Sequence, residues 1–359
     1  MISQTITSTE TGEKKLVTSA ELSQTQLNLS SSPHIRHTQT VPDIMRWVVI
    51  ALCPALIASF LFFGWRAIFL TCVSVIFAVL TEYLIVRLMK MPNTTGDFSA
   101  VITGILLAYN VSPSLPWWMV ALGSIFSIGV AKMTFGGLGS NFINPALAGR
   151  AFLMASYPAA MTSWTIPEGI IKGTLSGFDG VTGATPLAYF KNAVADGSFA
   201  NLNYQEVLQN LFIGNIGGCI GETSAIALLI GAIILWYKKI IGFRIPVVYI
   251  GTVFLLFWLF NGTGNLFTST AVFIPLFQIL SGGLFLGAFF MATDMVTSPI
   301  TPSGKLFFAL GCGLLTFIIR KFGGYPEGVS YSILIMNLFV PLIERYTRPS
   351  IYGKVRKRG

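Results

Sequence analysis

Residues 66–88 read RAIFLTCVSVIFAVLTEYLIVRL, an apolar run with charges only at Arg66, Glu82 and Arg87. A helix of about 20 residues crosses the roughly 30 Å hydrocarbon core of a bilayer. Because lipid offers no hydrogen-bond partners, such a segment must satisfy its own backbone groups, as an α-helix does. This stretch therefore predicts a transmembrane helix.

The rest of the chain repeats this pattern. Of its 359 residues, 53% are hydrophobic and 10% are charged, whereas a soluble domain has about 25% charged residues. We predict an all-α polytopic membrane protein with about ten transmembrane helices. The third, fifth and ninth are short, and some helices are expected to be broken, as at the binding sites of transporters. The predicted spans lie near residues 44–63, 66–88, 98–112, 117–134, 143–157, 208–235, 245–260, 271–292, 305–319 and 328–344.

Two hydrophilic segments flank the predicted transmembrane domain, residues 41–346. Residues 1–40 are rich in Ser, Thr and Gln without apolar periodicity, which predicts a polar arm. This arm lacks the basic start and apolar core of a signal peptide. Residues 347–359 form a basic tail.

The positive charges predict the orientation of the chain. The net charge of +9 is gathered at the ends of apolar runs and in the tail, which indicates the positive-inside rule rather than nucleic-acid binding. Both termini and Lys132 are then cytoplasmic, and the long loop 158–206 is periplasmic. Glu82 and Glu344 are interpreted as interfacial charges at span ends.

Arg320 and Lys321 break this rule, because the predicted topology places them outside. Two interpretations stay open for them. They are either a fixed cationic patch for a phosphate or an anchor whose long side chains reach the lipid headgroups.

Two stretches of the chain resemble each other. Gly104-Ile-Leu-Leu-Ala leads through a proline-containing loop and an apolar span to Phe135-Gly-Gly. Gly287-Ala-Phe-Phe-Met leads in the same way to Phe322-Gly-Gly. With five spans in each half, the halves must be inverted relative to each other. The sequence therefore predicts two inverted five-helix repeats, whose interface is where functional sites commonly lie.

The cysteines and histidines point away from a metal centre. Four cysteines fall in apolar runs without paired spacing, so they are interpreted as small buried hydrophobic residues. The only histidines, His34 and His37, precede the first span. We therefore expect no metal site.

The long loop contains the sequence Asp179-Gly-Val-Thr-Gly-Ala-Thr185-Pro. Glycines on both sides give this backbone freedom, and a threonine hydroxyl lies beside a carboxylate in the sequence. A modifying enzyme needs such an accessible segment to esterify a hydroxyl. By composition alone, however, an ordinary turn explains the same residues.

This segment closely resembles the flavin-attachment motif of the RnfD/NqrB family, in which a flavin transferase links FMN through its phosphate to the final threonine. The resemblance implies FMN on Thr185, with Asp179, Gly183 and Ala184 as part of the attachment motif. It extends from about Ser32 to Gly353 and is more like RnfD than NqrB. Further motifs that carry it are Phe135-Gly-Gly-Leu-Gly-Ser-Asn-Phe-Ile-Asn-Pro145, Gly221-Glu-Thr-Ser-Ala225, Phe290-Met-Ala-Thr-Asp294 and Gly323-Gly-Tyr-Pro-Glu-Gly328.

The resemblance also implies a function and partners. A family member is a subunit of a redox-driven ion translocase in the bacterial inner membrane. Its complex exchanges electrons between ferredoxin and NAD while it moves Na⁺ or H⁺. Electrons reach the FMN from another FMN-carrying subunit, and iron–sulfur subunits complete the route. We expect no catalytic residues in this chain and no activity of the chain alone.

Four further residues are candidates for binding or ion transfer. The amides of Asn141 and Asn144 suit either a flavin ring edge or a helix cap. The resemblance implies a second, non-covalent riboflavin in this region. Glu222 and Asp294 carry charge at membrane depth, where ionisable groups are costly and often functional. They are candidates for an ion path, or else for helix capping or pairing with a basic neighbour such as Lys305.

Three alternatives remain open at this stage. One is an NqrB-like subunit of a Na⁺-pumping complex that delivers electrons to a quinone. Another is a flavin-free secondary transporter, which the inverted repeat and short helices also fit. The third is a structural scaffold with a vestigial flavin site.

Overall fold

The computed structural model describes residues 39–91, 94–164, 186–187, 204–214, 216–260, 269–323 and 327–348. Within these residues every regular element is helical, which confirms the prediction of an all-α polytopic membrane protein. Asp179, Gly183, Ala184 and Thr185 lie outside the described residues, as do residues 1–38 of the arm and the tail from residue 349.

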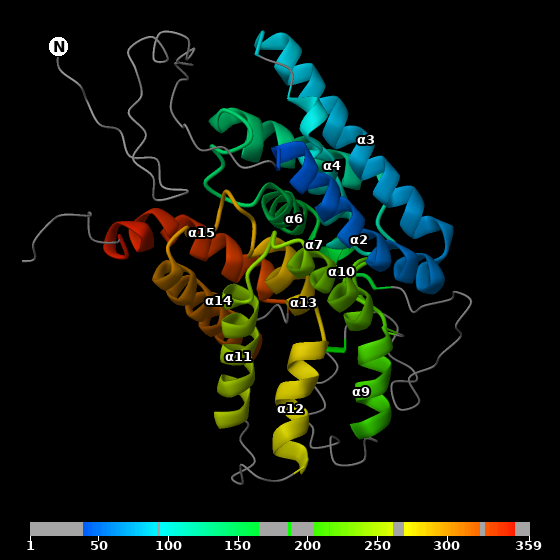
Figure 1. Cartoon of the computed structure of the whole chain (residues 1–359). Helices are drawn as coiled ribbons and strands as arrows, with labels where there is room; N and C mark the ends of the chain where they lie inside the picture. The colour runs from blue at the N-terminus through cyan, green and yellow to red at the C-terminus, as the bar shows by residue number, and fades with distance from the viewer. Residues whose placement is uncertain are drawn as a thin grey trace, which may run out of the picture. The chain divides into compact units, whose positions relative to one another are not determined.

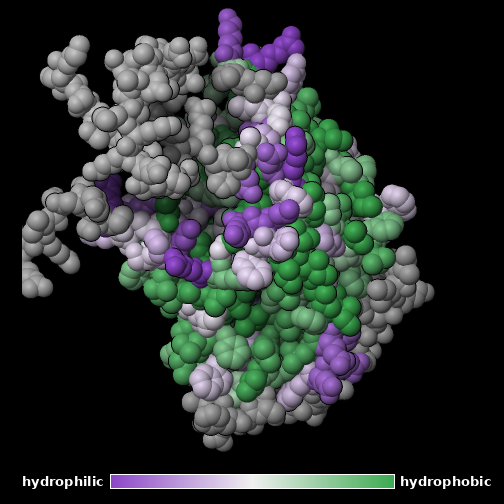
Figure 2. Space-filling view, viewed as in Figure 1, coloured by the Kyte–Doolittle hydropathy of each residue, from purple (hydrophilic) through white to green (hydrophobic). Residues whose placement is uncertain are grey.

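Within the described residues, four helices are long and apolar enough to cross a membrane. Their outward-facing side chains are largely aliphatic and aromatic, as expected for surfaces that contact lipid. Figure 2 shows hydrophobic residues over most of the face in view, with hydrophilic residues toward its upper part and at the lower right. These four are α2 (Val41–Phe63), α3 (Trp65–Leu88), the continuous stretch Trp117–Phe135, and α14 (Pro302–Phe322). The stretch Trp117–Phe135 comprises α5 (Trp117–Phe126), the π-helical η2 (Ser127–Lys132) and η3 (Met133–Phe135).

The other helices are shorter. The predicted third and fifth spans are indeed short, since α4 (Ser99–Tyr109) has 11 residues and α6 (Pro145–Ser156) has 12. The ninth was wrongly predicted to be short, because α14 has 21 residues and continues through its two basic residues. Other helices below the length of these four are α7 (Pro158–Met161), α10 (Ala225–Tyr237), α11 (Arg244–Leu259) and the 18-residue α15 (Val329–Tyr346).

Two predicted spans are broken. The span predicted at 208–235 is interrupted between α9 (Tyr204–Ile213) and α10. Gly214 there has a φ of +107°, and a Cβ at this position would lie 2.7 Å from the Ser224 backbone. The span predicted at 271–292 bends by 64° after α12 (Ser269–Leu280), before α13 (Leu284–Leu286) and η5 (Gly287–Met291). Apolar content alone predicted continuous helices and missed both breaks.

Helix α6 lies at the centre of the described structure. It packs against α4 and α5 of the first half of the chain and against α15 of the second. Figure 1 shows it near the middle, with α2, α3 and α4 on one side and α14 and α15 on the other. Side chains from α6 can therefore contact both halves.

A pocket and a buried charge cluster between broken helices

One pocket adjoins the start of α6, and we call it the Asn141 pocket. Its cavity volume is about 90 Å³. Its walls are mostly apolar, with a few polar groups among them. The lining residues include Val48, Ile102, Leu106, Lys132, Asn141, Asn144, Phe289, Phe290, Thr293 and Asp294.

The two asparagines of this pocket differ in their bonding. Asn144 caps α6, because its Oδ1 accepts from the backbone nitrogen atoms of Ala146 at 3.0 Å and Leu147 at 3.4 Å. Its Nδ2 donates to the Met291 carbonyl at 3.3 Å. Asn141 is buried, and its Oδ1 has no hydrogen-bond partner. A buried acceptor without a donor is costly, so this atom fits a ligand that brings an N–H or O–H group.

Lys132 and Glu82 form a fully buried ion pair beside the pocket. The Lys132 ammonium donates to Glu82 Oε2 at 2.8 Å and to Ser99 Oγ at 2.6 Å. Thr94 Oγ1 donates to Glu82 Oε1 at 2.8 Å. The two charged side chains are 1% and 0% exposed. The interpretation of Glu82 as an interfacial charge at a span end was therefore wrong, because Glu82 and Lys132 each provide the counter-charge that makes burial of the other tolerable.

Asp294 lies in the wall of the Asn141 pocket. Its carboxylate accepts from Thr297 Oγ1 at 3.0 Å, within the turn that follows η5. The ion pairs found within the described residues do not include one with Lys305. The geometry therefore gives Asp294 a local structural bond as well as a place beside the pocket.

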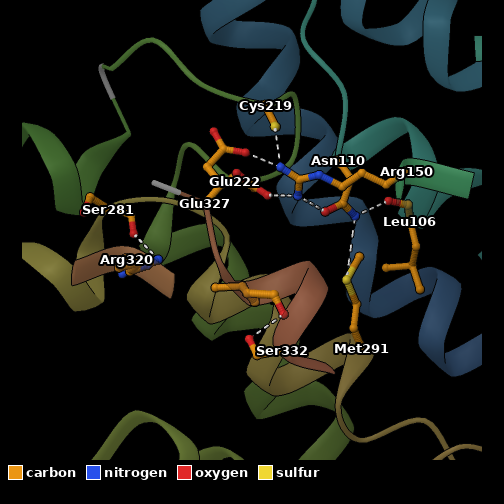
Figure 3. A network of polar contacts seen from close by, with 11 residues as sticks. Leu106, Asn110, Arg150, Cys219, Glu222, Ser281, Met291, Arg320, Glu327 and Ser332 are labelled. Atoms are coloured by element: carbon orange, nitrogen blue, oxygen red, sulfur yellow. Dashed lines mark hydrogen bonds and ion pairs between the residues drawn. The ribbon is translucent and has the colours of Figure 1, made fainter. Parts of the chain in front are cut away.

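A second group of charged residues surrounds Arg150 of α6 (Figure 3). Nη1 of Arg150 donates to Glu222 Oε1 at 2.9 Å and to Asn110 Oδ1 at 2.6 Å. Nη2 donates to the Glu327 carboxylate and contacts Cys219 Sγ at 3.8 Å. We call these five residues the Arg150 cluster. One arginine thus serves two carboxylates, and the three charged side chains are only 4–10% exposed.

The break before α10 places Glu222 in this cluster. Ile220 and Gly221 donate backbone hydrogen bonds to the carbonyls of Val111 and Tyr109, both at 3.0 Å. A Cβ on Gly221 would lie 2.2 Å from the Tyr109 ring, so only glycine allows this approach. Gly283 is equally close to Glu222, because a Cβ there would lie 2.2 Å from Oε1. Gly221 therefore lets the backbone approach Tyr109, and Gly283 leaves room for the Glu222 carboxylate.

The cluster resembles a cation site that is already filled. Cys219, Glu222 and Glu327 bring three potential ligand atoms within 4.8 Å of one another. The Arg150 guanidinium contacts all three and takes the place that a cation would occupy. Sequence reasoning missed the roles of Arg150 and Glu327; an arginine inside an apolar span was the available signal.

Met291 connects the pocket with the cluster. Its backbone oxygen accepts from Asn144, and its sulfur accepts from Asn110 Nδ2 at 3.7 Å. Asn110 in turn accepts from Arg150. The two sites therefore share one continuous set of contacts along α6.

Arg320 and Lys321 behave differently from each other. Arg320 is buried, and it donates to the Gln278 carbonyl and, at 3.2 Å, to the Ser281 carbonyl. Lys321 donates to the Phe260 carbonyl at 2.9 Å in an exposed position and lies over nearby aromatic rings. The interpretation as an interfacial anchor therefore fits Lys321 and is wrong for Arg320.

The four cysteines differ in their exposure. Cys219 and Cys312 are buried as predicted, whereas Cys53 and Cys72 are exposed. The prediction of burial was wrong for the latter two, because they lie on outward faces of long apolar helices.

These features define a polytopic α-helical membrane protein that holds a mostly apolar pocket and a buried charge cluster between broken helices. The model of the NQR2, RnfD, RnfE family matches residues 28–353. The chain therefore belongs to this family, as its motifs predicted.

Curated relatives match nearly the whole chain. The D-type subunit of the Na⁺-translocating ferredoxin:NAD⁺ oxidoreductase complex of Acetobacterium woodii is 47% identical over 340 residues, which cover 94% of this chain and 99% of that protein. The D-type subunit of the proton-translocating ferredoxin:NAD⁺ oxidoreductase complex of Clostridium ljungdahlii is 46% identical over 338 residues, covering 94% and 99%. Its counterpart in the ion-translocating oxidoreductase complex of Vibrio atlanticus is 36% identical over 351 residues, covering 90% and 99%.

Proposed function

We propose that this chain is the D-type membrane subunit of an ion-translocating ferredoxin:NAD⁺ oxidoreductase complex. The similarity to two proteins that carry this designation, over almost their full length, supports the role. The relative from Vibrio atlanticus is named more broadly, for an ion-translocating oxidoreductase complex. It favours the Rnf-type assignment over the quinone-linked NqrB-like alternative. The relatives from Acetobacterium woodii and Clostridium ljungdahlii differ in the ion that they are named for, so the translocated ion is left open between Na⁺ and H⁺.

Thr185 is proposed to carry FMN through a phosphodiester. The motif Asp179–Pro186 supports this attachment, with Asp179, Gly183 and Ala184 as its recognition residues. Pro186 and Leu187 follow directly and line a small pocket together with Glu222 and Glu327. The attachment segment therefore leads straight to the rim of the Arg150 cluster, which links the motif to the interior of the protein.

The attachment is tested by in-gel flavin fluorescence. We expect the denatured subunit to fluoresce when it is produced with its complex and a flavin transferase. Thr185→Val should abolish this signal, whereas Thr174→Val, a matched change in the same loop but outside the motif, should leave it intact. A Thr185→Val subunit that still fluoresces would rule out this attachment site.

The Asn141 pocket is proposed to hold a second, non-covalent flavin, riboflavin. Its apolar walls suit the flat body of an isoalloxazine ring, and the unpartnered Oδ1 of Asn141 suits a ring N–H donor. The flavin would supply the electron-transfer chemistry. Asn144 would orient Asn141 through the capped start of α6, and the apolar walls would exclude water.

This arrangement suggests the role of the subunit in its complex. The protein fixes the distance and orientation of two redox groups, one at the loop and one at the pocket. Partner subunits, including an FMN-carrying subunit and iron–sulfur subunits, would deliver and receive the electrons. We place the loop on the periplasmic face and both termini in the cytoplasm, in line with the distribution of positive charge.

Glu222 and Asp294 remain candidates for the ion path. Each lies beside one of the two proposed flavin sites, where a change of redox charge acts most strongly on a carboxylate. A flavin-free secondary transporter is the competing assignment. It predicts a purified subunit without either flavin.

A further inference from the structure

A second cavity lies where α11 and α14 begin, and we call it the Arg244 cavity. Its volume is about 550 Å³, within the range of roughly 300–1,000 Å³ that is typical of small-molecule sites. Two cationic residues, Arg244 and Lys305, line it. Most of its other lining residues are apolar, among them Ile245, Met295 and Ile300. This composition suits a ligand that combines an anionic group with an apolar part.

The two cations of this cavity lack an ion-pair partner in the part of the chain that the structure describes. Neither Arg244 nor Lys305 belongs to an ion pair there. Glu344 lies close to the rim, but its carboxylate accepts from the backbone nitrogen of Ile300 at 3.0 Å and pairs with neither cation. The cavity therefore offers two positive charges to a ligand.

The position of the cavity along α14 places it at the depth of lipid headgroups. Helix α14 is long and apolar enough to cross a membrane, and Lys305 lies in its first turn. Arg244 is the first residue of α11, which packs against α14 (Figure 1). The ends of a membrane-crossing helix lie near the boundary between hydrocarbon and headgroups. In the proposed topology, this end faces the cytoplasm.

Exposed apolar side chains continue from the cavity along both helices. Ile300 in the cavity wall is 80% exposed, and Phe243 and Met295 in the same wall are exposed as well. Farther along the two helices, Val247 of α11 and Phe307 of α14 are also exposed. A ligand with acyl chains covers such side chains, whereas a soluble anion leaves them uncovered.

We propose that the Arg244 cavity binds the headgroup of an acidic phospholipid. The lipid phosphate would lie between Arg244 and Lys305, because guanidinium and ammonium groups both bind phosphate oxygen atoms. Basic pockets between transmembrane helices bind acidic headgroups in this way on the cytoplasmic side of a membrane. The acyl chains would extend along the exposed apolar faces of α11 and α14.

The Asn141 pocket adjoins this cavity, so the lipid must be distinguished from a flavin. Ile240, Ile241, Thr293 and Met295 line both spaces. The competing occupant is therefore the polar chain of a flavin whose ring lies in the Asn141 pocket. The two occupants differ in one testable respect. Removing the cations of the Arg244 cavity leaves the flavin content unchanged only if the cavity holds a lipid.

The test uses the assembled complex in vesicles of phosphatidylcholine that contain a small fraction of photoreactive phosphatidylglycerol. Matched vesicles contain photoreactive phosphatidylcholine instead. After illumination, mass spectrometry quantifies the label on the peptide that carries Ile300. We expect more label from phosphatidylglycerol than from phosphatidylcholine. Exchange of chloride for inorganic phosphate at constant ionic strength should leave this excess unchanged.

Substitution of the two cations tests the site itself. We expect Lys305→Gln to lower the excess label about fivefold, and Arg244→Gln combined with Lys305→Gln to lower it about 25-fold. The matched control combines Arg87→Gln with Lys90→Gln. It removes two exposed cations at the end of α3, another membrane-crossing helix, and these line neither the Asn141 pocket nor the Arg244 cavity. The control should keep the full excess of label.

Four results would each overturn the proposal. Equal labelling by the two lipids would show that no acidic lipid is selected, and an equal loss of label in the control would show that general surface charge acts. Displacement by inorganic phosphate would assign the cavity to a soluble anion. Loss of releasable flavin from the double variant would assign it to the flavin. The comparison of the two lipids needs no substitution, so it decides the proposal even if the double variant fails to assemble.

Discussion

The Asn141 pocket and the Arg150 cluster both lie beside buried charge on or near α6, but they balance that charge in different ways. Beside the pocket, one cation meets one anion, Lys132 and Glu82, and space is left over. In the cluster, one arginine serves two carboxylates, and the guanidinium fills the centre. An ion pair beside free volume leaves room for a ligand. A cluster whose centre is filled has no such room, and it stabilises the fold instead.

Unpartnered atoms sharpen this contrast. The pocket keeps an acceptor, Asn141 Oδ1, without a donor, whereas in the cluster Asn110 and Glu222 both accept from Arg150. Because buried polar groups are normally satisfied, the first pattern indicates a site for a ligand. The second indicates a preorganised structural centre. The following predictions test that difference, from the largest expected effect to the smallest.

Removal of Arg150 should have the largest effect. Arg150→Gln leaves two buried carboxylates without a cation, which should cost about 3–5 kcal/mol of stability. The yield of assembled complex and its thermal midpoint would measure this loss. Arg150→Lys keeps the charge but not the planar fork, so it should recover only part of the stability. If Arg150→Gln were as stable as Lys321→Gln, the cluster would not be a structural centre.

Breaking the Lys132–Glu82 pair should cost less stability than removing Arg150, and a second substitution should restore part of the loss. Lys132→Met leaves Glu82 buried without its cation, but the carboxylate keeps its bond from Thr94. We expect a loss of about 2–4 kcal/mol. Adding Glu82→Leu should restore much of it, because no charge then remains. A double-mutant cycle of thermal midpoints measures this coupling, and strictly additive losses would contradict a contact pair.

Asn144→Ala should cause a small loss of stability together with loss of the ligand. The substitution removes the cap of α6, which costs about 1 kcal/mol, and it frees the Met291 carbonyl. Non-covalent flavin released by denaturation should fall below one per subunit. A normal flavin content would show that α6 does not need its cap to hold the pocket.

Asn141→Leu should have the smallest effect on stability and a selective effect on flavin. Its Oδ1 bonds nothing in the protein, so the free energy of unfolding should stay within about 0.5 kcal/mol of the unmodified value. The thermal midpoint should therefore be almost unchanged. The releasable flavin should be lost while the in-gel fluorescence at Thr185 stays intact. Destabilisation without a change in flavin content would make Asn141 a structural residue and leave the pocket without its proposed ligand.

The candidate sites were only partly predictable from the sequence. Asn141, Asn144 and Asp294 were singled out, and the structure brings all three to one pocket. Glu222 was expected in or at the rim of a continuous span, yet it lies in a break and bonds to Arg150, 72 residues away. Glu327 joins the same arginine across 177 residues. Contacts at such separations depend on how helices pack, and no local pattern of residue types encodes them.

The sequence by itself determined the helical class, the membrane setting and the family, because apolar runs and ordered motifs are local properties of the chain. Only the tertiary structure decided which charges are buried and what neutralises them. The charge pattern predicted a cytoplasmic position for Lys132 and an outer-face position for Arg320, yet both side chains are buried. Burial of a charge depends on the partner that folding brings to it. At Arg320, within the described residues, the contacting groups are the carbonyls of Gln278 and Ser281 rather than a carboxylate.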